Sequence, residues 1–188
     1  MIDKEKSLEY KFPELASEWH PTKNGYLNPA NITYGTNQKV WWKCEKKHEW
    51  QASPNHRTRG EGCPYCSNKK VLLGYNDILT TDPSIAKEWN YDKNGALLPT
   101  MLGRGSAKKV WWRCEKGHEW QALVYARTKG NTGCPYCCNQ KILLGYNDLV
   151  TVTPNLATEW NYDKNGNLLP SQVAPFTYKK VWWKCEEG

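Results

Sequence analysis

Long apolar runs are absent from this chain of 188 residues, and aliphatic side chains are sparse. The mean hydropathy is -0.82, and 14 glycines, 11 prolines and 11 tryptophans take up much of the composition. No stretch approaches the roughly 20 apolar residues that span a membrane. We therefore expect neither a membrane partner nor a large aliphatic core. Small domains of this kind need additional cross-links.

A secretory signal is also absent from the first residues of the chain. Residues 1–19 contain five acidic and three basic side chains and no apolar segment. We therefore expect a reducing, cytoplasmic location, where disulfides are rare. In that setting the eight cysteines favour metal ligation over disulfide bonding.

The sequence repeats itself with a period of about 70 residues. The string Lys-Val-Trp-Trp-Lys/Arg-Cys occurs at Lys39–Cys44, Lys109–Cys114 and Lys180–Cys185. In every copy a tryptophan precedes the cysteine by 25 residues: Trp19, Trp89 and Trp160. This constancy indicates one repeated folding unit. It predicts domains at residues 1–72, 73–143 and 144–188, the last being a truncated third copy.

Local signals predict an α+β fold for each unit. The β-prone runs Val40–Trp42 and Glu49–Gln51 flank a Cys-x-x-x-His turn, so they favour a hairpin whose tip holds two ligands. Asp82-Pro83 marks a helix start, and Ile85 and Trp89 would share one face of that helix. Each unit would then consist of a short helix, a hairpin and a Cys-Pro-Tyr-Cys knuckle.

Each complete copy contains three cysteines and one histidine at spacings typical of structural zinc. Two ligand pairs with internal spacings of three or four residues, separated by a loop of about 15, match a tetrahedral site. The loop length differs by one residue between copies, yet every ligand type is retained. We predict two structural Zn²⁺ ions per chain, in tandem zinc-ribbon or treble-clef modules. The ligands are Cys44, His48, Cys63 and Cys66 in the first copy, and Cys114, His118, Cys134 and Cys137 in the second.

Other uses of these cysteines are less favoured. A disulfide in each copy would suit a secreted chain. Histidine in place of a thiolate disfavours an iron–sulfur cluster, and four protein ligands leave no open position for catalytic zinc. Cys138 corresponds to Ser67 in the first copy, so it need not be a ligand. Cys185 lies in the third copy, which stops before its histidine and has no complete site.

These motifs resemble the bacterial and phage "probable zinc-ribbon domain" family. The matching strings are Val-Trp-Trp-x-Cys-x-x-x-His-x-Trp, Arg-Thr and Gly-Cys-Pro-Tyr-Cys, which occur in both complete copies: Val40–Trp50, Arg57-Thr58, Gly62–Cys66, Val110–Trp120, Arg127-Thr128 and Gly133–Cys137. Modules of that family occur in arrays, sometimes beside nuclease domains. The resemblance therefore implies a zinc-binding accessory role in DNA targeting.

The net charge of +7 is concentrated in the two zinc modules. Residues 39–70 contain eight basic and three acidic side chains, and residues 108–141 contain seven and two, so each segment carries +5. Basic surface beside loops rich in Arg, Thr, Asn and Gly is typical of phosphate binding. We expect nucleic acid, and DNA in particular, as the partner. The candidate contacts are Arg57, Arg59, Lys69, Lys70, Arg127, Lys129 and Lys141.

Two other function classes compete with nucleic-acid binding. The array could instead dock a protein, as a phage or mobile-element factor would, and nothing in the sequence excludes this. An enzyme is disfavoured because the repeated acidic residues outside the helices, Asp77 and Asp148, follow Gly-Tyr-Asn and suggest turns or helix caps. His56 is replaced by Ala126 in the second copy. We expect no catalytic activity.

Overall fold

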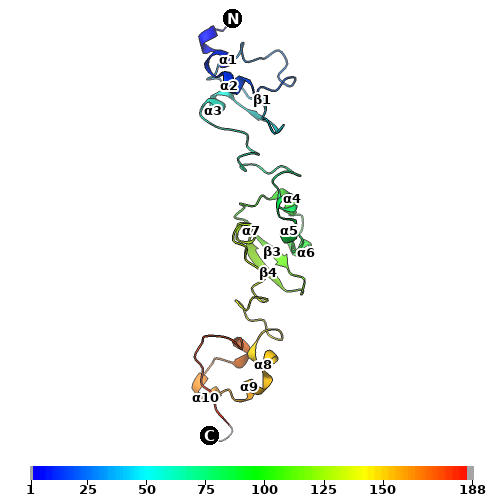
Figure 1. The fold of residues 1–188 in the computed structure, drawn as a ribbon, viewed down its shortest axis with the longest axis vertical. Helices are drawn as coiled ribbons and strands as arrows, with labels where there is room; N and C mark the ends of the chain where they lie inside the picture. The colour runs from blue at the N-terminus through cyan, green and yellow to red at the C-terminus, as the bar shows by residue number, and fades with distance from the viewer. Residues whose placement is uncertain (1, 186–188) are drawn as a thin grey trace. The chain divides into compact units, whose positions relative to one another are not determined.

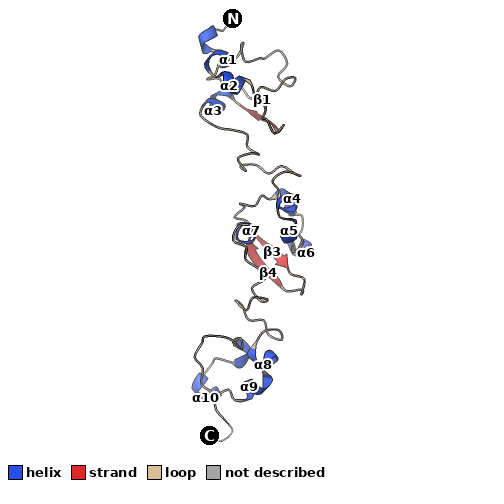
Figure 2. Cartoon of the chain, in the orientation of Figure 1, coloured by secondary structure: helices blue, strands red, loops and turns tan. Residues whose placement is uncertain are grey.

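The structure is a computed structural model that describes residues 2–185. It contains two compact units. One comprises the chain up to Thr81 together with Thr100–Gly103, and the other comprises Asp82–Pro99 and the chain from Arg104 onward. Helices of one turn alternate with long loops (Figure 1), and the strands belong to two hairpins (Figure 2). Among the described helices, none is long and apolar enough to cross a membrane.

The elements recur in the same order along the chain. The first repeat contains η1 (Lys4–Lys6), α1 (Leu8–Lys11), α2 (Pro13–Ala16), β1 (Val40–Lys43), β2 (Glu49–Ala52) and α3 (Pro54–Thr58). The second contains α4 (Ile78–Thr81), α5 (Pro83–Ala86), α6 (Tyr91–Asn94), η2 (Pro99–Met101), β3 (Lys109–Arg113), β4 (Glu119–Leu123) and α7 (Val124–Thr128). The third contains α8 (Leu149–Val152), α9 (Pro154–Thr158), α10 (Tyr162–Asn165) and η3 (Pro170–Gln172).

Two antiparallel hairpins confirm the predicted α+β fold. Strands β1 and β2 pair with Trp42 opposite Trp50, and β3 and β4 pair with Trp112 opposite Trp120. Side chains alternate between the two faces of a strand, so the two paired tryptophans of each hairpin lie on the same face of that hairpin. Each of the four is at most 5% exposed. These tryptophans therefore form the centre of each core.

The tryptophan that leads each repeat does not lie on a helix. Helix α5 ends at Ala86, a two-residue turn follows, and Trp89 then forms a β-bridge with Trp112. The predicted pairing of Ile85 and Trp89 on one helical face is wrong because Asn90 N–H donates to the Trp111 carbonyl at 3.2 Å. Backbone pairing beside the hairpin replaces the last helical turn.

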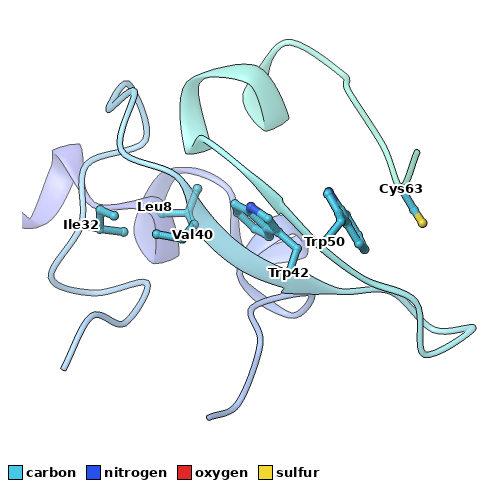
Figure 3. Packing of buried hydrophobic residues seen from close by; sticks show 6 residues of the cluster. All are labelled: Leu8, Ile32, Val40, Trp42, Trp50 and Cys63. Carbon is cyan, nitrogen blue, oxygen red and sulfur yellow. The ribbon is translucent and has the colours of Figure 1, made fainter. Parts of the chain in front are cut away.

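Each core is a short row of side chains along the hairpin. In the first repeat, the buried cluster comprises Leu8, Ile32, Val40, Trp42, Trp50 and Cys63. Figure 3 shows this cluster extending from Ile32 and Leu8, past the hairpin, to the ligand Cys63. Trp19 packs edge-on against Trp42, with ring centroids 5.5 Å apart. The core is thus small and ends at the metal site.

Asp77 and Asp148, which lie in the linker after each Cys-Pro-Tyr-Cys knuckle, cap helices, as predicted. An Asp77 carboxylate oxygen accepts the Thr80 N–H at 3.0 Å, and Asp148 accepts the Thr151 N–H at 3.0 Å. Both carboxylates also accept a glycine N–H from the preceding turn at 2.7 Å. Burial acts to raise the pKa of each carboxyl, but these hydrogen bonds together outweigh it and the pKa is lowered. Capping is therefore a structural role of both residues.

The third repeat begins to fold in the same way. Leu149, Ala157, Trp160 and Val173 form a buried cluster, and Trp160 bridges Trp183 as Trp19 bridges Trp42. No second strand covers Trp183 in the part of this repeat that the structure describes, and this side chain is 40% exposed. Cys185 is exposed and belongs to neither of the two ligand clusters found among residues 2–185.

Candidate metal centres and cationic residues

The structure brings the eight predicted ligands together in two clusters, in each of which the ligand atoms lie within 4.8 Å of one another. The hairpin tip supplies one cysteine and the histidine of each cluster, and the Cys-Pro-Tyr-Cys turn supplies the other two cysteines. All eight cysteines of the chain are free thiols, so no disulfide competes for them.

The spacing of the ligand atoms matches a tetrahedral zinc ion bound through histidine Nδ1. Zn–S and Zn–N bonds of ordinary length place two sulfurs about 3.8 Å apart, and a sulfur and a nitrogen about 3.6 Å apart. In the first cluster Cys44 Sγ lies 3.9 Å from Cys66 Sγ and 3.6 Å from His48 Nδ1. The equivalent distances in the second cluster, from Cys114, are 3.9 and 3.5 Å. The donor set therefore fits structural zinc with no reorganisation of its backbone.

A tight turn at each hairpin tip sets this geometry. Cys44 N–H donates to the His48 carbonyl at 3.1 Å, and Lys47 N–H donates to the Cys44 carbonyl at 2.8 Å. The turn requires a left-handed residue, with φ of 64° at Lys47 and 80° at Gly117. Glycine meets this requirement without the steric cost that a lysine bears.

Two of the ligand thiols, those of Cys63 and Cys134, need the metal to ionise at neutral pH. Burial raises the pKa of Cys63 to about 11, and burial raises that of Cys134 to about 11 as well. At neutral pH both are protonated without a metal, so zinc must displace protons as it binds. Acid therefore competes directly with zinc for these sites.

A tyrosine from the following linker covers each ligand histidine. The rings of His48 and Tyr75 meet edge-on with centroids 4.1 Å apart, and those of His118 and Tyr146 are also 4.1 Å apart. Lys46 Nζ donates to Tyr75 Oη at 3.2 Å. The domain boundary predicted after residue 72 would separate Tyr75 from this site. The repeated Gly-Tyr-Asn-Asp string is the sequence signal for this contact, because its tyrosine occurs in both complete copies.

The residue after Tyr75, Asn76, connects the Cys-Pro-Tyr-Cys knuckle to the linker through hydrogen bonds. The buried Asn76 side-chain amide donates to the carbonyls of Tyr65 and Lys70 at 3.1 and 2.9 Å. Asn147 makes the equivalent bonds to Tyr136 and Lys141 at 3.0 and 2.9 Å. Zinc, tyrosine and asparagine thus fix one continuous structure from the hairpin tip to the linker.

Two of the predicted phosphate contacts are core residues, which corrects the sequence analysis. Arg57 is 3% exposed and Arg127 is 5% exposed. Arg57 pairs with Glu18 at 2.7 Å, and its guanidinium carbon lies 4.8 Å from the centroid of the Trp42 ring. Arg127 pairs with Glu88 in the same way. Burial lowers the pKa of Arg127, while Glu88 opposes that change.

The other predicted contacts lie on the surface. Lys69 and Lys70 line a groove together with Lys39 and His56, which the sequence analysis had not selected as contacts. Arg59 is exposed outside this groove, and Lys129 and Lys141 are exposed on the second module. Their role in nucleic-acid binding remains a prediction.

Two metal clusters on short hairpins, each completed by a knuckle, define a tandem zinc finger with structural metal. The family described as "Probable Treble clef zinc finger domain" matches residues 15–69, 85–140 and 156–188. The chain belongs to this family, and its modules are treble-clef repeats. The resemblance noted in the sequence is therefore confirmed.

One curated relative is described as prophage-derived. The chain is similar to the "SPbeta prophage-derived uncharacterized protein YomD" of Bacillus subtilis (strain 168), with 25% identity over 140 residues. The match covers 74% of this chain and 47% of the relative. The chain thus corresponds to about half the length of that protein.

Replacing a buried ligand is expected to unfold one module and spare the other. Cys63→Ser and Cys134→Ser should each reduce the zinc content from two ions to about one, because the remaining donors cannot complete a tetrahedral site. Cys138→Ser is the matched control, since the Cys138 Sγ contacts the Cys134 carbonyl at 3.1 Å and lies outside the ligand cluster. Elemental analysis measures the zinc. Equal losses in all three variants would contradict the assignment.

Removing the tyrosine cover should weaken the first zinc site. Tyr75→Ala removes the ring against His48 and the Lys46 hydrogen bond, so we expect zinc affinity to fall on the order of tenfold. Chelator competition measures this, and the second site of the same molecule serves as an internal reference. Tyr26→Ala, at a residue that is 85% exposed, is the control. If both variants behave alike, Tyr75 does not support the metal.

Substitution of Arg57 should destabilise the fold, whereas substitution of the nearby Arg59 should not. Arg57→Ala leaves Glu18 without its partner and opens the space against the tryptophans, so we expect about 2–3 kcal/mol loss of stability. Arg59→Ala changes an exposed side chain and should alter stability by less than about 0.5 kcal/mol. Denaturant unfolding with excess zinc, followed by tryptophan fluorescence, measures both. Comparable losses would remove the distinction drawn from burial.

Proposed function

We propose that this treble-clef array binds nucleic acid, with DNA as the expected partner, and has no catalytic activity of its own. Zinc is structural in this proposal, because three cysteines and one histidine occupy all four tetrahedral positions of each site. The repeated aspartates cap helices, which leaves them no role as a general base. The proposal is supported by a difference among the cations: some form ion pairs with carboxylates, whereas the exposed ones among the predicted contacts do not.

The paired cations lie close to carboxylates of the same module. Lys23 contacts Glu49 at 2.5 Å, and Lys93 contacts Glu119 at 2.5 Å. Both lysines also lie over a tryptophan ring, at 4.6 and 4.2 Å from the centroids of Trp41 and Trp111. These ammonium groups are already neutralised and positioned, so they contribute little to attraction of an external anion.

Several unpaired cations lie at the hairpin base and beside the knuckle. Within residues 2–185, no ion pair involves Arg59, Lys69, Lys70, Lys129 or Lys141. All five are exposed. An unpaired, exposed cation attracts counterions, and a phosphate that displaces them gains the free energy of their release. The distribution therefore favours a polyanionic partner.

The setting of the proposal is a phage or other mobile element, and its location is the reducing cytoplasm. The prophage origin of the relative supports the first point. Free thiols that serve as zinc ligands support the second, because a reducing compartment preserves them. Docking of a protein remains the competing function, and the outcome of binding measurements separates the two.

Salt dependence tests the proposal directly. The zinc-loaded chain is titrated with labelled duplex DNA, single-stranded DNA and RNA between about 50 and 200 mM salt. Log affinity should fall linearly with log salt, with a slope near -0.9 for each phosphate contacted on duplex DNA. Absence of binding to all three ligands would favour the protein-docking function.

A pair of double variants distinguishes specific contacts from net charge. Lys70→Gln with Lys141→Gln removes two unpaired cations at equivalent positions, and it should reduce the magnitude of the duplex slope by up to roughly 0.9 per contact. Lys23→Gln with Lys93→Gln removes two paired cations, also at equivalent positions, and should leave the slope nearly unchanged. Equal effects would mean that only the overall charge matters.

A further inference from the structure

A groove on the first module lies between the hairpin base and the segment after the knuckle. Its volume is about 560 Å³. Strand β2 and the start of α3 form one wall, and the residues on either side of Cys63 form the other. The cationic lining residues are Lys39, Lys69 and Lys70, with His56 beside them, and the polar ones include Asn37 and Gln51.

The charge of this groove suits an extended anion. Lys39, Lys69 and Lys70 have no carboxylate partner among the described residues, and Glu61 is the one carboxylate of the described lining. The three lysines come from segments about 30 residues apart in the sequence. Three ammonium groups beside side-chain amides offer donors spread along an open surface, which match successive phosphates of a strand.

The walls of the groove are held before any ligand binds. Lys70 N–H donates to the Pro64 carbonyl at 3.0 Å, and the Lys70 carbonyl accepts the Asn76 amide at 2.9 Å. On the opposite wall, the Asn55 side-chain amide donates to Asn37 Oδ1 at 2.8 Å. The backbone positions of the lysines therefore require little ordering on binding, which reduces its entropic cost.

The second module reproduces this lining only in part: it keeps Lys109, Gln121 and Lys141 at the positions of Lys39, Gln51 and Lys70, and it has no carboxylate at the position of Glu61. Gln140 stands at the position of Lys69, Ala126 at that of His56, and Ala107 at that of Asn37. The buried arginine and tryptophan below this surface are the same in both modules. The guanidinium carbon of Arg127 lies 5.3 Å from the Trp120 ring centroid, and that of Arg57 lies 5.2 Å from the Trp50 ring centroid. The two modules thus share an interior and differ in the surface above it.

We infer that the groove of Lys39, Lys69 and Lys70 in the first module is the chain's main binding site for a phosphodiester backbone, whereas the second module contributes weaker contacts. This inference rests on the proposed function and adds a location and an asymmetry to it. His56 and Gln51 supply donors or acceptors beside the phosphates. The nucleotide strand would lie along β2.

Two charge-matched triple variants of the full zinc-loaded chain test the inference. Lys39→Gln, Lys69→Gln and Lys70→Gln together empty the groove of ammonium groups. Lys109→Gln, Lys129→Gln and Lys141→Gln remove three exposed cations from the second module. On duplex DNA at about 100 mM salt, the first triple variant should bind on the order of 10- to 100-fold more weakly, and the second less than about threefold more weakly.

A gain-of-function variant provides an independent measurement. Ala126→His with Gln140→Lys installs the missing groove residues in the second module, and it should raise the affinity of the full chain several-fold. Zinc content and the unfolding midpoint are measured for every variant. If the first triple variant loses zinc, the gain-of-function variant decides, and an unchanged affinity would overturn the inference.

The outcomes separate this inference from the proposed function. Binding by the parent with equal losses in the two triple variants would overturn the asymmetry and leave nucleic-acid binding standing. A parent that binds neither DNA nor RNA would overturn both. A larger loss on RNA or on single-stranded DNA than on duplex DNA would support the groove and identify which phosphodiester strand it receives.

Discussion

The four-ligand zinc clamp is the constraint on which each complete module depends. The first core contains six buried hydrophobic residues, one of which is itself a metal ligand. In zinc-finger peptides a structural zinc ion supplies an apparent 10–16 kcal/mol at neutral pH, about the whole net stability of an ordinary domain. With short helices and two-stranded sheets, the metal therefore decides whether the hairpin and the knuckle meet at all.

A buried arginine is the second interaction that connects the segments of each complete module, and it acts together with the metal. Arg57 joins the leading segment through Glu18 and the loop before Cys63 through the Glu61 carbonyl at 2.8 Å, while its guanidinium stacks on the hairpin tryptophans. Three thiolates give the zinc site a net charge of about -1. In the second module, burial lowers the pKa of Arg127 and the charges of Glu88, Cys134 and Cys114 oppose that change, so burial of this arginine and ionisation of those thiols support each other.

The sequence predicted the ligands and the hairpins because both follow from local spacing. A Cys-x-x-x-His turn between two β-prone runs leaves few alternatives, and Asp77 and Asp148 cap helices for reasons contained in four residues. Trp89 was misplaced because it forms a β-bridge with Trp112, a residue outside the local window. Helical spacing was a valid local pattern, and a tertiary contact overrode it.

The fate of the arginines could not be predicted from charge alone. Arg57 and Arg59 are two residues apart and chemically identical, yet one is buried against Trp42 and the other is exposed. A clue was present in the leading segment, since Glu18 and Glu88 recur at the same distance from Arg57 and Arg127. Only the fold shows that these residues meet across 39 positions of sequence.

Comparison between the repeats separates framework from surface more reliably than composition does. A position that keeps its side chain in both modules, such as Arg57 and Arg127, satisfies a packing requirement that both copies share. A position that differs between the modules, such as Lys69 and Gln140, has no such packing requirement because its side chain faces solvent. Repetition alone therefore argues for structure, and the residues that can give one module its own partner are those in which the copies diverge. Because the metal and the arginine hold the interior constant, such surface changes cost the fold little.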